Sequence, residues 1–534
     1  MNQPGALFEL IASMSQSEKR YFRLFSALQS GTKQYEYLFD AVDQALPEPG
    51  TAVDYHALEQ VVRLKLEEGA LVAQNQYPVV KNHLYNHILK ALRYSREDQQ
   101  EPEVRITNWI SESINLEKKG LFAQALSRLV KARKLAEKYE NLPLLVEILD
   151  RMIRLNAQHP PDKKKWFENY MHTQQEKARA VENLRLESVY KQLYFDLLAL
   201  YKSRTEIKDS KARIKAIFEN ELLTQSEKAV TFNAQIYLYS LLSFRHLLDG
   251  NKERMVFYQK KVIQTWENYD HLIEIDPVRF KVAIYNYLVY NHALQDLKEF
   301  ETYINRFKKL MKSTSGSIGP NASSEVVSDY ERLVQLQYIL LLNTGEIDKA
   351  MTLTREVEHW LAQPGIEEKM RPGALIWIQF DCFISYFFNE QYHESQVRVD
   401  KIHALPKAQG NEVKLTASML ELIILYELNI DERFQSYKTS SAIHQYKRSQ
   451  HYKAFEKMVL SNLKKLRNPK GNHRKKLLSF EKAFDEFERN SSGQSISGMG
   501  EVKIWLKAKV QKKSLKTVSK ELAQEQLNPV AEKV

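Results

Sequence analysis

The sequence predicts an all-α fold, a solenoid of αα-hairpins preceded by a helical module at the N-terminus. Glycine (16) and proline (15) are scarce for a chain of 534 residues, which disfavours a β-protein with its many tight turns. Within residues 122–139, apolar side chains recur at spacings of three and four, the pattern of one apolar face on a helix. A composition of 43% hydrophobic and 27% charged residues is that of an ordinary folded protein.

Residues 1–100 are predicted to form the N-terminal helical module. Ser15 and Glu18 have the spacing of a capping box, which marks the start of a helix. Three further helices are predicted at 34–45, 54–68 and 77–93, bounded by segments that contain proline or glycine.

The helix predicted at 77–93 has a polar face rich in lysine, histidine and asparagine. This face is either a DNA recognition surface or the solvated side of an amphipathic helix. We expect the second, because no short helix-turn-helix spacing accompanies it. His83 and His87 are one helical turn apart, as two metal ligands can be, but no third ligand is near in the sequence. We therefore expect ordinary surface histidines.

Residues 106–139 contain the clearest αα-hairpin. Lys119 and Gly120 separate two amphipathic segments, and helices joined by so short a turn must lie antiparallel. The hairpin resembles a tetratricopeptide repeat, although Glu112 stands where that motif has leucine. The residues that carry the resemblance are Trp109, Ser113, Leu116, Gly120, Phe122, Ala125, Leu129 and Ala132.

Weaker copies of the hairpin follow, with glycine-equivalent positions at 250, 298, 345 and 390. The steps between these positions are 48, 47 and 45 residues, longer than the period of about 34 in tetratricopeptide repeats. The resemblance is therefore to the wider tetratricopeptide-like class with lengthened helices, over about half of the chain. It implies a protein that binds other proteins.

Composition divides the remainder of the chain into six segments. The linker among them is rich in serine and glycine, which is typical of flexible chain. The segments are helical repeats at 101–312, a loop at 313–324, helical repeats at 325–440, basic helices at 441–490, a flexible linker at 491–500 and a basic tail at 501–534.

Residues 501–510 alternate apolar and polar side chains, the period-two pattern of a β-strand. Two interpretations stay open. The segment adds as a strand to the sheet edge of a partner, or it belongs to a disordered basic tail. The candidate contact residues of this tail are Lys503, Trp505, Lys507 and Lys509.

Positive charge gathers toward the C-terminus. The net charge of the chain is +11, and residues 438–520 contain 21 lysine and arginine residues against 6 acidic ones. Such an asymmetry concerns partners rather than fold. Residues 438–520 therefore either bind nucleic acid or form a solvated basic surface.

The helix expected at 375–388 (LIWIQFDCFISYFF) is hydrophobic on all sides, a pattern that normally indicates burial. Carrying the repeat register back from residue 390 places one side of this helix in the groove of the solenoid, where aromatic residues make good binding hot spots. The alternative is that another helix of the chain covers this side. The candidate groove residues are Trp377, Phe380, Ile384 and Phe387.

The sequence carries no catalytic, cofactor or metal motif. Its single cysteine, Cys382, excludes an intramolecular disulfide and a cysteine-based zinc cluster. Val397 stands where the H-E-x-x-H motif begun by His393 needs its second histidine. Neither a signal peptide nor a membrane-spanning stretch is evident. We therefore expect a cytoplasmic, non-catalytic scaffold or adaptor, without a cofactor, that binds a peptide or helix of another protein in the solenoid groove. The alternative is a nucleic-acid-associated protein.

Overall fold

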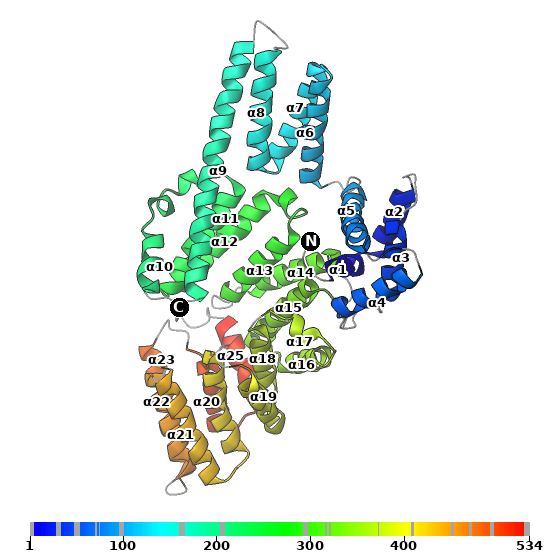
Figure 1. Cartoon of the computed structure of the whole chain (residues 1–534). Coiled ribbons are helices and arrows are strands. Elements are labelled where there is room, and N and C mark those ends of the chain that lie inside the picture. Colours follow the sequence, from blue (N-terminus) through cyan, green and yellow to red (C-terminus); the bar gives the residue numbers. More distant parts are fainter. Residues whose placement is uncertain are drawn as a thin grey trace. The chain divides into compact units, whose positions relative to one another are not determined.

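The all-α prediction is confirmed by a computed structural model, whose described residues form helices α1 to α25 and no strand (Figure 1). Successive helices pack against their neighbours in the chain, as in a helical solenoid. The chain divides into two compact units, Met1–Leu242 with Thr265–Ile275, and Ser243–Gln264 with Asp276–Val534. The structure describes residues 5–27, 34–46, 54–69, 72–73, 75–95, 101–159, 166–202, 209–291, 297–314, 318–319, 322–371, 373–406, 411–449, 453–468, 472–491 and 496–527.

The first five helices pack around a hydrophobic core of their own, which includes Leu7, Phe22 and Leu84. The predicted capping box is present, because the Ser15 backbone N–H donates to the Glu18 carboxylate at 2.7 Å and the Glu18 N–H donates to Ser15 Oγ at 3.3 Å. The helices are α1 (Ala6–Ser13), α2 (Gln16–Ala27), α3 (Gln34–Ala45), α4 (Tyr55–Glu68) and α5 (Tyr77–Ser95).

The prediction of two surface histidines on α5 is correct for His83 and wrong for His87. His87 is buried, and its ring centroid lies 5.1 Å from that of Phe25 and 5.0 Å from that of Tyr35. Aromatic side chains of α2 and α3 thus cover this side of α5. Within the described ranges, no three His, Cys, Asp or Glu side chains come together as a metal site would require.

The hairpin predicted at 106–139 is formed by α6 (Pro102–Lys118) and α7 (Phe122–Lys138). Gly120 has a φ of 73° in the turn, in the left-handed region that glycine enters without a steric penalty. Small Ala125 and Ala132 are fully buried, so the helices approach closely. The helices that follow are α8 (Leu142–Gln158), α9 (Trp166–Lys202), α10 (Ser210–Phe218), α11 (Phe232–Leu248) and α12 (Lys252–Asn268).

Several hairpins of the second unit have left-handed residues in the turns that the structure describes. Three of the four predicted turn positions have positive φ, namely Gly250 (70°), Gly345 (69°) and Glu390 (60°). Lys298, the fourth, lies inside α14 instead. The helices are α13 (Pro277–Asn291), α14 (Leu297–Thr314), α15 (Ser324–Asn343), α16 (Ile347–Leu361), α17 (Ile366–Lys369), α18 (Ala374–Phe388), α19 (Tyr392–Ala404), α20 (Asn411–Glu427), α21 (Glu432–Arg448), α22 (Ala454–Arg467), α23 (His473–Asn490), α24 (Met499–Gln511) and α25 (Leu515–Leu527).

Both interpretations of residues 501–510, a strand and a part of a disordered tail, are wrong, because these residues form most of α24. The side chains that α24 buries include Val502, Trp505 and Leu506, whose spacings of three and four are helical. Ile504 and Val510 are apolar as well, and their presence creates the apparent period of two. Since neighbouring helices are available to bury one side of the segment and no sheet is present in the described residues, the helix is the stable choice.

The structure describes only parts of the loop predicted at 313–324 and of the linker predicted at 491–500. Ser323 caps α15, and α14 continues to Thr314. Residues 315–317 and 320–321 of the predicted loop, 492–495 of the predicted linker, and 528–534 of the predicted tail lie outside the described residues. In the described part of the linker, Ser497 Oγ lies 2.8 Å from Thr416 Oγ1 on α20, so residues 496–498 pack against the body of this unit.

No helix in the described part of the chain combines the length and the apolar character needed to cross a membrane.

Candidate functional site

The four candidate groove residues of α18 do not lie together on an open surface. Phe380, Ile384 and Phe387 are 9%, 2% and 0% exposed, whereas Trp377 is 50% exposed. Three of the four therefore belong to the core, as the alternative interpretation of this helix holds.

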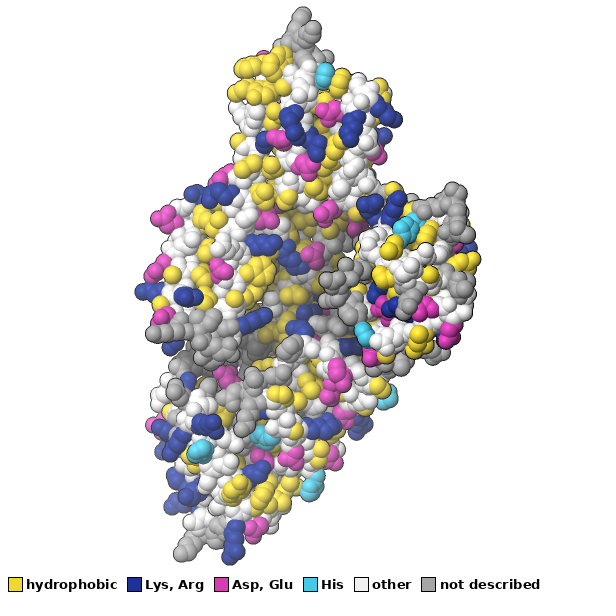
Figure 2. All heavy atoms as spheres, viewed as in Figure 1, with side chains coloured by type: hydrophobic (Ala, Val, Ile, Leu, Met, Phe, Trp, Pro, Cys, Tyr) yellow, Lys and Arg dark blue, Asp and Glu magenta, His cyan; other side chains and the backbone are white. Residues whose placement is uncertain are grey.

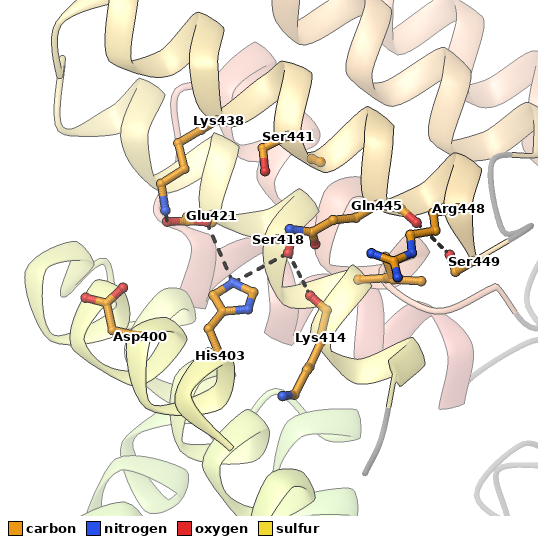
Figure 3. Close-up of a pocket in the computed structure, with 12 residues that line it drawn as sticks. Asp400, His403, Lys414, Ser418, Glu421, Lys438, Ser441, Gln445, Arg448 and Ser449 are labelled. Carbon is orange, nitrogen blue, oxygen red and sulfur yellow. Dashed lines mark hydrogen bonds and ion pairs between the residues drawn. The ribbon is translucent and has the colours of Figure 1, made fainter. Parts of the chain in front are cut away.

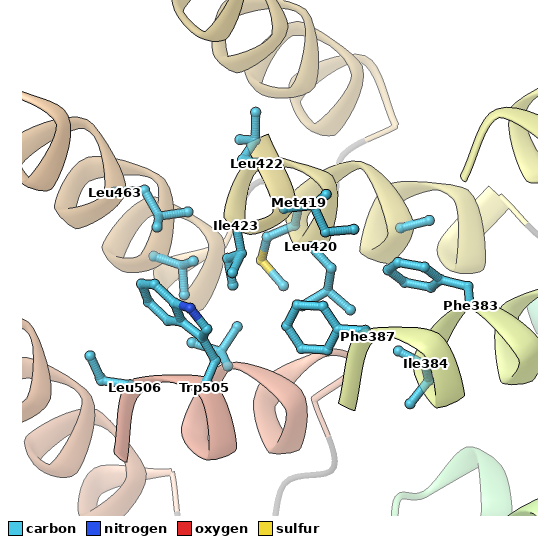
Figure 4. Close-up of a cluster of buried hydrophobic side chains, with 14 of the residues drawn as sticks. Phe383, Ile384, Phe387, Met419, Leu420, Leu422, Ile423, Leu463, Trp505 and Leu506 are labelled. Atoms are coloured by element: carbon cyan, nitrogen blue, oxygen red, sulfur yellow. The ribbon is translucent and has the colours of Figure 1, made fainter. Parts of the chain in front are cut away.

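Other helices of the same chain cover the buried side of α18 (Figure 4). Met419 and Leu420 of α20 face Phe387, while Trp505 of α24 points toward Ile423 of α20. All of these side chains belong to one hydrophobic cluster that runs from α16 to α25. The space in which a partner's apolar residues were expected is thus filled by the chain itself.

The candidate contact residues of the tail are engaged inside the protein. Trp505 is fully buried and donates its indole N–H to Glu427 Oε1 at 2.7 Å. Lys509 Nζ donates to Glu427 Oε2 at 2.5 Å, and Lys503 Nζ donates to Glu488 at 2.7 Å. Lys507 is partly exposed. The indole and two of the three lysines therefore hold α24 in place.

An open recess of about 700 Å³ lies between α19, α20 and α21 (Figure 3). Four of its residues recur along α21 at spacings of three and four, so they share one helix face. The lining residues are Asp400, His403, Lys414, Leu415, Ser418, Glu421, Lys438, Ser441, Ala442, Gln445, Arg448 and Ser449.

The floor of the recess is a neutralised charge cluster around Glu421, which is 3% exposed. Its carboxylate accepts hydrogen bonds from Lys438 Nζ at 2.8 Å and from Gln396 Nε2 at 2.9 Å. His403 Nε2 lies 3.9 Å from the other carboxylate oxygen. Burial lowers the pKa of His403 below its ordinary value against the attraction of Glu421, so the imidazole is neutral at neutral pH.

Ser418, His403 and Glu421 do not have the geometry of a catalytic triad. Both Ser418 Oγ, at 3.5 Å, and the Glu421 carboxylate face the same ring nitrogen, Nε2 of His403. A triad needs the carboxylate on the opposite nitrogen, so that it orients the base toward the hydroxyl. Ser418 instead donates its proton to the Lys414 carbonyl at 2.9 Å.

Cys382 is also unsuited to nucleophilic chemistry. Its side chain is fully buried in α18, and burial raises the pKa of the thiol to about 12. The reactive thiolate is therefore absent near neutral pH.

An available cation and exposed aromatic side chains lie at opposite ends of α21, which forms one wall of the recess. Arg448 is exposed and makes no ion pair with any residue that the structure describes. Phe434 and Tyr437, 45% and 69% exposed, lie within one turn of the lining residues on α21. The Lys438 ammonium is 5.6 Å from the Phe434 ring centroid, so this aromatic side chain adjoins the floor cluster.

Sequence reasoning missed this recess for a physical reason. Polar residues at 438, 441, 445 and 448 look the same on a solvated helix face as on the wall of a recess. Only the packing of α19 beside α20 and α21 makes the difference. No protein-family model matches the chain, and a search of curated proteins found no relative.

Proposed function

We propose that this chain is a non-catalytic scaffold that binds a segment of another protein, and that the recess between α19, α20 and α21 receives this segment. The contrast between the floor and the mouth of the recess is the main support. On the floor, Lys438 neutralises Glu421. At the mouth, Arg448 presents a guanidinium without a partner among the described residues.

The chemistry of the mouth indicates what the partner supplies. A guanidinium binds a carboxylate through two parallel hydrogen bonds, which gives direction as well as affinity. Exposed aromatic side chains such as Phe434 and Tyr437 are enriched in protein interfaces. Arg448 lies 11 residues after Tyr437 and 14 after Phe434 on α21, which is about 16–21 Å along a helix. We therefore expect a partner segment in which an acidic residue lies about this distance from an apolar or aromatic one.

Two further observations favour a protein ligand over a reaction. Small-molecule sites enclose most of their ligand, whereas this recess is open to solvent. His403 has no carboxylate on its second nitrogen among the contacts described, so it is not oriented as a general base.

The experiment is affinity purification of the tagged full chain, with and without nuclease. It compares the wild type with the variants Arg448→Ala and Arg433→Ala. Arg433 is an exposed arginine at the start of the same helix and outside the recess, so it is the matched control. Losing a charged hydrogen bond at an interface costs about 1.5–3 kcal/mol. We therefore expect Arg448→Ala to reduce recovery of a nuclease-resistant protein partner by about tenfold or more.

Equal recovery with Arg448→Ala and Arg433→Ala would exclude the recess as the binding site. Partners that disappear entirely on nuclease treatment would exclude the protein scaffold.

A nucleic-acid-associated function is the second proposal, supported by exposed cations on α22 and α23. Lys464, Lys465, Arg474 and Lys475 are exposed, and Figure 2 shows lysine and arginine side chains over the α21–α23 region. Some other cations of residues 438–520 are occupied. The Arg467 guanidinium, for example, donates to the Leu422 carbonyl at 3.0 Å. Binding of a labelled oligonucleotide should weaken steeply with salt if this function holds; no binding at low salt would exclude it.

A further inference from the structure

The C-terminal hairpin of α24 and α25 lies along carboxylates that belong to three successive hairpin turns. Glu346 follows the turn residue between α15 and α16, Glu390 is in the turn between α18 and α19, and Glu427 ends α20. Burial raises the pKa of Tyr392, and the negative charges of Glu427 and Glu390 raise it further, as expected if these carboxylates lie near one another.

Each of these carboxylates contacts the C-terminal hairpin. Glu427 binds Trp505 and Lys509 of α24. Glu390 accepts a hydrogen bond at 3.2 Å from the backbone N–H of Leu515, the first residue of α25. Glu346 lies 4.0 Å from Lys520 Nζ, and Asp348 pairs with Lys516. An acidic edge on the repeats thus matches a basic amphipathic helix.

The two helices of this hairpin are held very differently. α24 inserts Trp505 and Leu506 into the main cluster and bonds to Glu427, whose side chain is 9% exposed. α25 also places Leu515 and Val518 in this cluster and buries Ala523, but it contributes neither an aromatic side chain nor an indole hydrogen bond. In its ion pair with Asp348, Lys516 is 44% and the aspartate 72% exposed. Exposed ion pairs contribute little and are screened by salt.

A short turn connects the two helices. Lys512 adopts a left-handed conformation (φ 56°) at the end of α24, and Thr517 N–H donates to Ser514 Oγ at 3.2 Å at the start of α25. The chain therefore turns over three residues, and the hydrogen bonds of Trp505 and Lys509 to Glu427 do not involve α25.

We propose that α25 is a displaceable occupant of a second binding surface, formed by the acidic edge of Glu346, Asp348 and Glu390, and that the external ligand of this surface is a basic amphipathic helix of another protein. Because α25 occupies this surface within the chain, its sequence indicates what the ligand must carry. The ligand needs apolar residues at positions i, i+3 and i+8, as in Leu515, Val518 and Ala523, with lysines beside them. None of these residues lines the recess, so this proposal and the proposed function are tested separately.

The experiment uses the full chain and a fluorescently labelled peptide of residues 512–527. Val518→Asp places a charge in the buried side of α25 and should release it, whereas Thr517→Asp adds the same charge on the exposed side and is the matched control. We expect the Val518→Asp chain to bind the peptide at least about tenfold more tightly than wild type or Thr517→Asp, because the competing cis helix is gone. The binding should weaken with added salt.

Specificity is tested with a second peptide in which Lys513, Lys516 and Lys520 are replaced by glutamate, which should not bind. Absence of peptide binding to a Val518→Asp chain that keeps its helical circular dichroism would overturn the proposal. So would equal binding by wild type and Val518→Asp, which would place the peptide elsewhere. A Val518→Asp chain that loses its cooperative melting would also overturn it, because α25 would then be an indispensable part of the core.

Discussion

A Cβ atom at Gly345 would lie 2.6 Å from the Cα atom of Lys520, so the turn between α15 and α16 and the helix α25 touch through their backbones. Gly345 also has a φ of 69°. Both facts require glycine here: one for the turn, the other for the approach of a helix 175 positions later in the chain.

Gly345→Ala should therefore destabilise the protein by about 1–3 kcal/mol, since a backbone atom must move and the left-handed conformation is strained. Gly365→Ala is the control, because Gly365 has a similar φ of 74° with no atom within 4 Å of an added Cβ. Denaturant unfolding measures both variants. Equal losses would mean that α25 does not press on this turn.

Trp505→Ala should cost about 3–5 kcal/mol, the usual loss for truncating a buried tryptophan, and it also leaves Glu427 without its indole donor. Trp377→Ala should change stability by less than about 1 kcal/mol, because half of that side chain is exposed. Thermal melting of the two variants separates them. A large loss at Trp377 would contradict its placement on the surface of α18.

Ala125→Leu should overpack the α6–α7 hairpin and lower stability by about 1–3 kcal/mol, since Ala125 is fully buried. Ala123→Leu, at an exposed position on the same helix, adds the same atoms in solvent and should be nearly neutral. The melting curves of both variants are the test. If the two substitutions have the same effect, the close contact of the hairpin is absent.

Asp381 on α18 and Glu501 on α24 should make stability depend on pH. Burial raises the pKa of Asp381 well above its ordinary value and the charge of Glu501 raises it further, while burial also raises the pKa of Glu501. The folded protein thus holds these protons more tightly than the unfolded chain. The stability that these two protonated carboxyl groups contribute is fully present below the ordinary carboxyl pKa of about 4. It is lost as pH rises through their raised pKa values.

Asp381→Asn removes one of these ionisations and its repulsion of Glu501. We expect the variant to gain stability relative to wild type as pH rises from about 4 to about 8. Glu394→Gln, which neutralises an exposed carboxylate on α19, should not show this gain. Denaturant titrations across this pH range provide the measurement, and a parallel pH profile of wild type and Asp381→Asn would contradict the prediction.

Local sequence determined the helices and many of their ends. The capping pair Ser15 and Glu18, the turn at Gly120 and the buried alanines of α7 act within a few residues of one another, so spacing alone identifies them. The same holds for the hairpin register at Gly345 and Glu390, whose backbone conformations the repeat pattern located.

Tertiary packing decided which faces of those helices meet solvent. The sequence pattern of α18 placed Trp377 and Phe387 on one side of the helix. In the structure α20 and α24 cover Phe387, whereas Trp377 is half exposed. The alternation in residues 501–510 fits a strand or a helix, and burial against α20 selects the helix. The recess beside Arg448 and the acidic edge beneath α25 join residues up to 174 positions apart. No local pattern encodes such pairs, because their energies arise only when distant segments exclude water together.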